Sequence, residues 1–500
     1  MTIKKRLRKP YKLLKINKLK IIIDVFCEGK NLKLREIVEI IANNQTAETL
    51  AEQEVTGYSI DSRNIKSGQL FFAIKGEKFD GHDFVESALT AGALAAVVKE
   101  DFAKFSDSRL IKVPDTLIAL QQLASEVLRR WDRPVIGITG SAGKTTTKEL
   151  TALVLSAKGQ VHKSIGNLNN AYGLPLSILE MVSNGAKASD FDFAVLEMGM
   201  STAGEIRRLC QIAPPNVGAV LNVKAVHLEN FENIQGIANA KAELIEGLNP
   251  NGLAVLNADD PLVLPMQTRH LGKTITFALE NPAEIRAINA QSLGVLGSKF
   301  RLITTKGQAD VSFPLAGKHL LYNALIAAAI GDYFELSAET IAERLQLARP
   351  AYHRGELLKF TEGFLIVDDS YNSNPHALNE MVKMLAQTTG FSRKIVVAGE
   401  MLELGKTAVE MHQSCGKFIA ENKIDLLVGV RALAQEIVNG AVSAGMAKEN
   451  TYFASTVQEA SQFLAENIKA KDLILIKGSR GVKTELIIDL LKEKFSWEKT

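Results

Sequence analysis

The run from Val135 to Lys148, VIGITGSAGKTTTK, restricts the possible folds and chemistry of this chain more than any other segment. Its apolar, β-branched start predicts a buried strand, and its end opens a helix that continues through KELTALVL. A glycine turn between a strand and a helix N-terminus directs several backbone N–H groups at one point, where they can hold an anion. The segment therefore predicts a phosphate-binding loop in an α/β fold.

Two side chains of this loop predict a nucleoside triphosphate as the anion. Lys144 adds a positive charge, and Thr145 offers a hydroxyl to a magnesium ion bound to the phosphates. The usual pattern has a further glycine where this chain has Ile138, so the shorter form GxxGKT is the one that fits. A plain connecting turn is the alternative, but such a turn does not need a lysine followed by two threonines.

Composition indicates a globular chain of several domains. Its 500 residues are 46% hydrophobic and include only 13 prolines, which suits about two to four packed domains. The three cysteines lie far apart and form neither a disulfide framework nor a zinc-binding spacing, which favours a reducing cytoplasm. No apolar run approaches the roughly 20 residues that a membrane helix needs.

The first 20 residues differ in charge from the rest of the chain. They hold nine Lys or Arg and no acid, and without these nine the chain has 50 basic and 56 acidic residues, a net charge of −6 instead of +3. The remaining chain is mildly acidic, so we expect no nucleic-acid surface on it. The basic segment is suited to anionic lipid or RNA; a structureless leader or an upstream start codon chosen in error are the alternatives.

Hydrophobic patterns divide the rest of the chain into three α/β regions. Short segments from Leu34 to about Asp115 predict a small α/β domain. Apolar strands then alternate with helices, which predicts a mostly parallel central sheet, followed by a more antiparallel patch over 283–313. The last third predicts a dinucleotide-fold-like domain without GxGxxG. We expect a basic extension at 1–33 and domains at 34–115, 116–348 and 349–500.

Two residues follow strands of the predicted central sheet. Glu197 ends the strand FDFAVLE, and His227 lies just past VGAVLNV. Because ligands of open parallel sheets lie beyond the carboxyl ends of the strands, we expect both residues to face the phosphate-binding loop. A carboxylate is a suitable magnesium ligand, whereas histidine is an unusual one.

Three further residues have two interpretations each. Lys241 lies in the helical pattern GIANAKAELIEG, which by itself favours a solvated lysine paired with Glu243 or Glu246. Asn169 and Asn170 lie in GNLNNAYGLP, a loop bounded by glycine and proline. Asparagines in such loops are common turn residues, and they can also orient an anionic substrate.

A series of segments carries a resemblance to a known family: TGSAGKTTTKE, GNLNNAYGLPLSIL, LEMGMSTAGEI, HLENF with AKAE, NADDP, HRGE, DDSYNSNP and KGSRG. In this order they resemble the bacterial Mur ligases over about residues 34–500. DDSYNSNP, LEMGM and GEMLELG favour the member that joins D-alanyl-D-alanine to a UDP-linked muramoyl tripeptide. Addition of a single amino acid, or of glutamate to a folate, is the alternative within this chemistry.

The resemblance implies an ATP-dependent peptide ligase of peptidoglycan synthesis that proceeds through an acyl phosphate. The implied substrates are UDP-N-acetylmuramoyl-tripeptide, with diaminopimelate or lysine as its third residue, and D-alanyl-D-alanine. The implied cofactors are ATP and Mg²⁺, and we expect a cytoplasmic monomer that binds no nucleic acid. A different class stays open, namely a nucleotide-dependent switch whose basic segment docks on a membrane or RNA.

The resemblance also implies roles for residues around ATP. Those expected at the triphosphate are Thr139, Gly140, Ser141, Ala142, Gly143, Lys144, Thr145 and Thr146. The magnesium-associated positions are Thr145, Glu197, His227 and Lys241, of which Lys241 matches a lysine that is carbamylated in several of these ligases. Asn323 matches an adenine contact, Arg354 an arginine on the γ-phosphate and Asp369 a ribose-binding acid. The residues expected to act in catalysis are Lys144, His227, Lys241 and Arg354.

The contacts to the other substrates are implied in the same way. The segment SIDSR, with Ser59, Asp61, Ser62 and Arg63, resembles the part of the first domain that holds the UDP end of the substrate. The segment KGEKFDGHDF, with Gly81, His82 and Asp83, lies near that site in the family. The incoming dipeptide is expected near Lys477, Ser479 and Arg480 of KGSRG. Further substrate contacts are expected from Asn169, Asn170 and Asn372.

Overall fold

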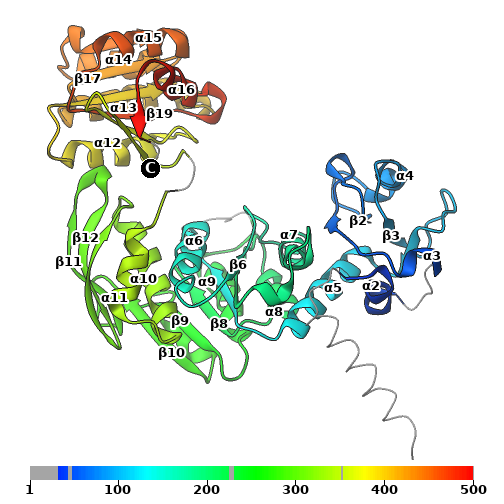
Figure 1. Ribbon diagram of the computed structural model, residues 1–500. Helices are drawn as coiled ribbons and strands as arrows, with labels where there is room; N and C mark the ends of the chain where they lie inside the picture. The colour runs from blue at the N-terminus through cyan, green and yellow to red at the C-terminus, as the bar shows by residue number, and fades with distance from the viewer. Residues whose placement is uncertain (1–31, 43–47, 225–229, 351–352, 499–500) are drawn as a thin grey trace, which may run out of the picture. The chain divides into compact units, whose positions relative to one another are not determined.

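The structure is a computed structural model that describes residues 32–42, 48–224, 230–350 and 353–498 (Figure 1). The chain divides into two compact units, one of Met1–Arg286 with Tyr322–Leu336 and one of Ala287–Leu321 with Ser337–Thr500. Among the described residues, no helix combines the length and the apolar character that a membrane span requires. Helices and strands alternate in both units, which confirms the predicted α/β class.

A small parallel sheet opens the first unit, and its strands pair in chain order: β1 (Gly57–Ser59), β2 (Gln69–Phe72), β3 (Ala95–Lys99) and β4 (Leu110–Val113). Successive residues face opposite sides of a strand. Leu70 and Phe72 therefore pack with α2 (Leu34–Ile41) and α5 (Thr116–Trp131), whereas Phe71 packs with α4 (Val85–Thr90). The short helix α3 (Glu48–Ala51) precedes the sheet. The predicted small α/β region is confirmed.

The second sheet of this unit carries the predicted phosphate-binding loop. Its strand order is β10-β9-β8-β5-β7-β6, with all neighbours parallel. The strands are β5 (Val135–Thr139), β6 (Val161–Lys163), β7 (Phe193–Glu197), β8 (Val217–Val220), β9 (Leu253–Asn257) and β10 (Lys273–Ala278). Every residue of β5, β7, β8 and β9 is buried, as expected for parallel strands covered on both faces.

The loop after β5 lies at the topological switch point of this sheet. Strands β6 and β7 lie on one side of β5, and β8, β9 and β10 lie on the other. Ligands of open α/β sheets bind at such a point. The helices of this part are α6 (Lys144–Leu155), α7 (Gly173–Leu179), α8 (Glu205–Ile212), α9 (Ile234–Glu246) and α10 (Lys318–Tyr333), of which Tyr322–Tyr333 belong to this unit.

The predicted antiparallel patch is confirmed only in part. In the second unit, β12 (Ser298–Thr304) and β13 (Gly307–Phe313) pair antiparallel, and α11 (Ala338–Gln346) packs on them. The strand before them, β11 (Ile285–Ser292), begins parallel to β10, so the prediction was wrong for this strand. Between the two strands, the carboxylate of Asp259 accepts three successive backbone N–H groups, from residues 279–281.

A third sheet forms most of the second unit, in the order β18-β17-β16-β19-β15-β14-β20. Val367, Val396 and Leu475 pack with the helices over 375–387, 408–421 and 434–443, whereas the intervening Ile366 and Ile474 pack with those over 457–467 and 485–494. This two-sided parallel sheet confirms the dinucleotide-fold-like prediction. Its parallel strands are β15 (Leu365–Asp368), β16 (Arg393–Gly399), β17 (Leu426–Val430), β18 (Thr451–Ala454) and β19 (Asp472–Lys477).

Two antiparallel strands at one end of this sheet, β14 (Glu356–Phe360) and the edge strand β20 (Trp497–Glu498), were not predicted. The helices of the sheet are α12 (Pro375–Gln387), α13 (Ala408–Glu421), α14 (Ala434–Ser443), α15 (Val457–Asn467) and α16 (Glu485–Lys494). The two edge strands of this sheet are therefore β18 and β20.

Candidate active site

The phosphate-binding loop is fixed by one side chain from the neighbouring strand end. The Ala142 N–H donates to Oδ1 of Asn222 at 3.1 Å, and Nδ2 of Asn222 donates to the Ala142 carbonyl at 3.0 Å. The Ser141 N–H donates to the Asn222 carbonyl at 3.0 Å. Asn222 follows β8, which pairs directly with β5. Sequence reasoning missed this residue, although its place after a strand of the same sheet was a usable signal.

Gly143 has a backbone conformation and surroundings that exclude a side chain. Its φ of +87° lies in the left-handed region, and a Cβ would come 2.5 Å from Cδ2 of Leu221 and 2.9 Å from Oδ1 of Asn323. An L-residue would therefore be strained and would clash. Gly143 lets the loop turn directly into α6, whose first N–H groups are the anion donors expected from the sequence.

The side chain of Lys144 folds back over this loop. Its Nζ donates to the Gly140 carbonyl at 3.1 Å. Burial lowers the pKa of Lys144, and the nearby carboxylate of Glu197 partly opposes this effect. The positive charge thus lies at the loop, where a triphosphate would meet it.

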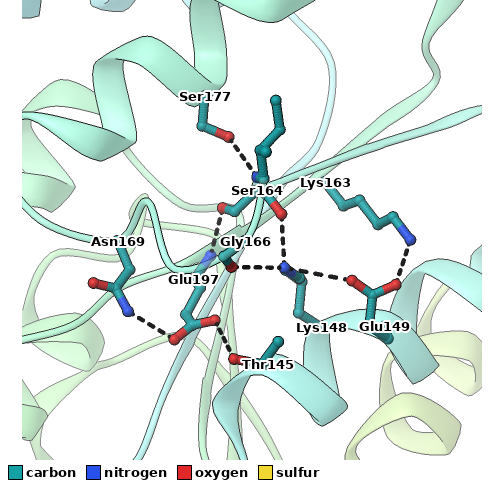
Figure 2. A network of polar contacts seen from close by, with 10 residues as sticks. Thr145, Lys148, Glu149, Lys163, Ser164, Gly166, Asn169, Ser177 and Glu197 are labelled. Carbon is teal, nitrogen blue, oxygen red and sulfur yellow. Dashed lines mark hydrogen bonds and ion pairs between the residues drawn. The ribbon is translucent and has the colours of Figure 1, made fainter. Parts of the chain in front are cut away.

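Glu197 meets Thr145 as the sequence predicted. The Glu197 side chain is buried, and its Oε2 accepts the Thr145 hydroxyl at 3.0 Å. Its Oε1 accepts Nδ2 of Asn169 at 2.7 Å, and its backbone N–H donates to Oγ of Ser164 at 2.9 Å (Figure 2). A carboxylate and a hydroxyl held together at a phosphate-binding loop are a donor set that fits Mg²⁺.

The other expected magnesium positions differ in what the structure shows. His227 lies outside the described residues. Lys241 is 3% exposed, so the solvated-lysine interpretation of its pattern was wrong. The residues expected to pair with it bind elsewhere: Glu243 accepts the N–H groups of Gly204 and Arg207, and Glu246 pairs with arginines. Among the described residues, no group of three or more His, Cys, Asp or Glu could hold a metal.

Burial also changes the acid–base properties of Lys241. It lowers the pKa of the amine to about 7, and the positive charge of Lys144 acts in the same direction. Neutral amine is therefore abundant near neutral pH. Because a neutral amine is the form that adds carbon dioxide, the environment suits the carbamylation implied by the family resemblance.

Two buried polar atoms near the loop lack hydrogen-bond partners among the described residues. They are Nδ2 of Asn323, whose side chain is 1% exposed, and Oγ1 of Thr139 at the end of β5. A buried donor without a partner is unfavourable unless a ligand satisfies it. Next to Asn323, the Tyr322 hydroxyl donates to Oδ2 of Asp259 at 3.0 Å and fixes this turn of α10. Asn323 is thus suited to the nucleotide contact expected of it.

The neighbouring asparagines have separate roles. Asn169 contacts Glu197, as described above. Oδ1 of Asn170 instead accepts the N–H groups of Tyr172 and Gly173, at 3.2 Å and 2.9 Å, where α7 begins. Asn170 therefore acts as a turn residue in this structure, which was one of its two interpretations.

The expected UDP contacts of SIDSR lie together after β1. Asp61 accepts the backbone N–H and both guanidinium donors of Arg63, and these bonds lower its pKa to about 2. The side chain of Arg63 is 83% exposed. The Ser59 hydroxyl bonds the backbone of Asp61, and Ser62 opens the following 3-10 turn. The arrangement presents a guanidinium to solvent on a fixed turn.

The second expected UDP segment is held by its histidine. Nδ1 of His82 lies 2.7 Å from Oδ1 of Asp80, and Nε2 accepts the Lys99 N–H at 3.1 Å. Both ring nitrogens are therefore used within the protein, and His82 fixes the segment. The Gly81 N–H donates to the Ile74 carbonyl, and Asp83 pairs with Lys104.

In the second unit, the ammonium group of Lys477 is buried and pairs with the carboxylate of Asp369. Its Nζ donates to Oδ2 of Asp369 at 2.6 Å and to the Asn372 carbonyl at 2.9 Å, and its side chain is 4% exposed. Burial raises the pKa of Asp369, while Lys477 opposes that effect. The adjacent strand ends Asp368 and Ile476 are paired in register, which brings the two loops together. Lys477 thus positions the expected ribose-binding acid.

The ring of Tyr371 lies near both expected arginines. The guanidinium carbon of Arg354 is 4.2 Å from the Tyr371 ring centroid, and that of Arg480 is 5.9 Å from it. Ser479 connects the loops further, because its hydroxyl accepts the Leu402 N–H at 3.0 Å and donates to the Ser373 carbonyl at 3.3 Å.

Sequence reasoning missed the base of this loop. The buried His353 and Asp368 meet at 2.5 Å between Nδ1 and Oδ2, and Asp368 also accepts the Ser370 hydroxyl. The motifs HRGE and DDSYNSNP gave Arg354 and Asp369 as candidate residues, but not this histidine–aspartate pair.

Comparison with known proteins gives the family. The family models that match are "Mur ligase family, catalytic domain" over residues 54–127, "Mur ligase middle domain" over 138–331 and "Mur ligase, glutamate ligase domain" over 353–480. A Bacillus subtilis protein named UDP-N-acetylmuramoyl-tripeptide–D-alanyl-D-alanine ligase is 35% identical over 468 residues, 93% of this chain and 99% of the relative. The chain belongs to the Mur ligase family.

Solved structures agree with this assignment. A crystal structure of MurF from Acinetobacter baumannii superposes with a TM-score of 0.78 at 29% identity, over 93% of this chain and 98% of that one. MurF from Thermotoga maritima, solved in complex with ADP, gives a TM-score of 0.68 at 29% identity, over 88% and 98%. The Mur ligase fold predicted from the motifs is therefore confirmed, and the chain covers nearly the whole length of these relatives.

Within this Mur ligase, each unit gathers its own set of expected residues. The first brings together the phosphate-binding loop, Glu197, Asn169 and Asn323. The second brings together Asp369, Asn372, Lys477, Ser479, Arg354 and Arg480. These contacts give each group a defined local environment, and the roles of the individual residues stay predictions.

Proposed function

We propose that this Mur ligase joins D-alanyl-D-alanine to UDP-N-acetylmuramoyl-tripeptide, with conversion of ATP to ADP and phosphate, in peptidoglycan precursor synthesis. Its similarity to the Bacillus subtilis ligase of that name, over 93% and 99% of the two chains, supports these substrates. The observation that carries the chemistry is the grouping of Lys144, Thr145 and Glu197 at the loop after β5.

ATP is required because a carboxylate is a poor electrophile at neutral pH. Phosphorylation of the tripeptide carboxylate gives an acyl phosphate and ADP. The amine of D-alanyl-D-alanine then attacks the acyl carbon, and the tetrahedral intermediate expels phosphate as the amide forms. In this proposal Lys144 and Arg354 neutralise charge during phosphoryl transfer, while the N–H groups of the loop hold the triphosphate in place.

The oxygen ligands described above support a magnesium ion in this site. Thr145 and Glu197 would hold it, together with His227 and a carbamylated Lys241, and the ion would offset phosphate charge when bound. Asn323 would contact the adenine and Asp369 the ribose. Each of these assignments rests on a match between this chain and the family motifs.

The proposal assigns a main ligand to each predicted domain, and residues 349–500 also supply Arg354 and Asp369 to ATP. Residues 34–115 would bind the UDP end through Ser59, Asp61, Ser62, Arg63, Gly81 and Asp83, with His82 as support. Residues 116–348 would bind ATP. Residues 349–500 would bind D-alanyl-D-alanine through Arg480 and Asn372, with Lys477 and Ser479 as positioning residues. We propose a cytoplasmic monomer without nucleic-acid partners, as composition suggests.

The experiment measures ADP release and the transfer of oxygen from the tripeptide carboxylate to the released phosphate. Tripeptide substrate labelled with ¹⁸O in its terminal carboxylate is incubated with ATP, with and without D-alanyl-D-alanine. We expect ADP release that depends on the dipeptide and ¹⁸O in the released phosphate. Lys144→Ala is expected to abolish ADP release with an unchanged circular dichroism spectrum, because it removes the cation at the loop. Unlabelled phosphate, or higher turnover with diaminopimelate, lysine or glutamate, would refute the proposed reaction.

A further inference from the structure

Lys148 is a buried lysine to which the proposed mechanism gives no role. It lies one helical turn after Lys144 in α6, and its side chain is 1% exposed. A lysine is almost never buried this deeply unless acceptors match its charge. Its contacts should therefore show why the charge is kept inside.

Three acceptors surround the Lys148 ammonium (Figure 2). Its Nζ donates to the carbonyl oxygens of Ser164 at 2.6 Å and Gly166 at 3.3 Å, and it lies 3.4 Å from Oε1 of Glu149. Two of the three N–H donors of the ammonium thus have carbonyl acceptors, and the carboxylate of Glu149 balances its charge. Both carbonyls belong to the loop that follows β6, and Lys148 thereby ties α6 to residues 164–169.

The same loop holds Glu197 from two sides. Oγ of Ser164 accepts the Glu197 N–H at 2.9 Å, and Nδ2 of Asn169 donates to Oε1 of Glu197 at 2.7 Å. Further anchors come from Ser177, whose Oγ accepts the Ile165 N–H, and from the Gly199 N–H, which donates to the Asn169 carbonyl. Figure 2 shows this path from Lys148 through the loop to Glu197 and Thr145.

A glycine lets the loop present its carbonyls to the lysine. Gly166 has φ of +51°, in the left-handed region, and a Cβ there would meet nothing within 4 Å. The position therefore requires backbone freedom and not space. This left-handed residue lies in the loop after β6, which ends at Lys163. Carbonyls that no longer pair with a neighbouring strand need another donor, and the ammonium supplies it.

We propose that Lys148 is a positioning residue of the magnesium–nucleotide site. It holds residues 164–169 so that Ser164 and Asn169 orient the Glu197 carboxylate towards Thr145. Lys148 itself touches neither nucleotide nor metal. This inference rests on the proposed function only in its use of magnesium and ATP, and it does not depend on the peptide substrates.

The test compares nucleotide binding with and without metal. Lys148→Met keeps the length of the side chain and removes its charge and donors. By calorimetry we expect ADP to bind about 10-fold more weakly in the presence of Mg²⁺, the usual scale for loss of a group that orients a metal ligand. With EDTA, the affinity should change by less than about 2-fold. In the free variant, the amides of residues 164–170 should exchange with deuterium faster than in the wild type.

Lys163→Met is the matched control. Lys163 pairs with the other oxygen of Glu149, but its side chain is 47% exposed and lies outside the path to Glu197. We expect wild-type binding and exchange from this variant. Should Lys148→Met not fold, Lys148→Gln replaces it, because its amide retains a donor for one carbonyl, and the same selectivity for Mg²⁺ is expected.

A double-mutant cycle with Asn169→Ala tests whether Lys148 acts through the loop. Asn169→Ala removes the far end of the path and leaves α6 unchanged. If Lys148 and Asn169 act on Glu197 through the same path, the loss of affinity in the double variant should not exceed the larger of the two single losses. Wild-type binding by Lys148→Met, equal losses with and without Mg²⁺, or additive losses would overturn the proposal. None of these measurements needs peptide ligation. A failure of the proposed ligation reaction can therefore be distinguished from a failure of the role proposed for Lys148.

Discussion

Lys241 illustrates how burial of one residue decides its chemistry. Its pattern on α9 was compatible with a solvated lysine, but the side chain is 3% exposed and its pKa is lowered to about 7. A buried lysine whose amine is partly neutral cannot form an ion pair at the surface, but it is well suited to covalent modification. Burial and neighbouring charge come from segments distant in sequence, so periodicity could not reveal them.

We expect Lys241→Ala to lose ligation activity, and short carboxylic acids such as formate or acetate to restore part of it. The alanine leaves room where a carbamylated lysine would place its carboxylate, and a free carboxylate can occupy that room. The expected loss is about 100-fold or more. Activity is measured as ADP release over a series of acid concentrations, with chloride as the control. An active variant, or an inactive one without rescue, would refute the carbamylation proposal.

Tyr371 gives a second prediction at this scale. Its ring contacts the guanidinium groups of both Arg354 and Arg480, and loss of one such exposed contact weakens positioning by about 0.5–1 kcal/mol. We expect Tyr371→Leu to raise the KM values for ATP and dipeptide by about 2- to 5-fold each. Tyr371→Phe keeps the ring and should stay near wild type. Identical kinetics of the two variants would show that the ring has no such role.

Residues placed by strand ends were the most predictable. Glu197 and Thr145 were expected to meet because both follow parallel strands of one sheet, and they do. Asn222 was missed although its place after β8 was a usable signal, whereas Lys148 was missed because its partners are backbone atoms of a distant loop. A backbone carbonyl has no identity in sequence, so such contacts leave no motif.

At the level of elements, the strand β6 carries an acid-sensitive residue. His162 is buried, its ring packs edge-on against Phe191 at 5.3 Å between centroids, and burial lowers its pKa to about 4. The charged form is therefore disfavoured in the folded state. Since the unfolded residue has a pKa near 6.5, the stabilisation is complete above that pH and is lost as the pH falls towards 4.

We expect His162→Phe to remove this dependence on pH. Between pH 7 and pH 4.5 the free energy of unfolding of the wild type should fall by about 2 kcal/mol more than that of the variant. Urea denaturation at a series of pH values measures this difference. The exposed His376 provides a matched control, because His376→Phe should keep the wild-type slope. Parallel pH profiles for wild type and His162→Phe would contradict the prediction.

Strands were predictable where both faces of their sheet are buried. The apolar runs of β5, β7, β8 and β9, and of the sheet around β16, gave their positions directly. There were exceptions. The edge strand β20 has only two residues, and β11 begins parallel to β10 within a patch that was expected to be antiparallel. Local composition does not encode either fact, because each depends on a partner elsewhere.

At the scale of the whole molecule, charge is distributed unevenly along the chain. Deleting residues 1–20 changes the net charge from +3 to −6. We expect the deletion to leave ADP release within about 2-fold of wild type and to weaken binding to anionic vesicles, since each basic residue near such a surface contributes about 1 kcal/mol. Sedimentation with anionic and neutral vesicles, at low and high salt, measures this. Equal binding of both proteins to anionic vesicles would exclude this role for the segment.

The order in which the segments of the two units follow one another along the chain has a consequence for folding during translation. The first unit includes Tyr322–Leu336, and these residues are translated only after Ala287–Leu321, which belong to the second unit. A nascent chain halted before residue 336 therefore carries an incomplete first unit and a part of the second unit whose other residues are not yet made. We expect newly made protein to depend on chaperones during this interval.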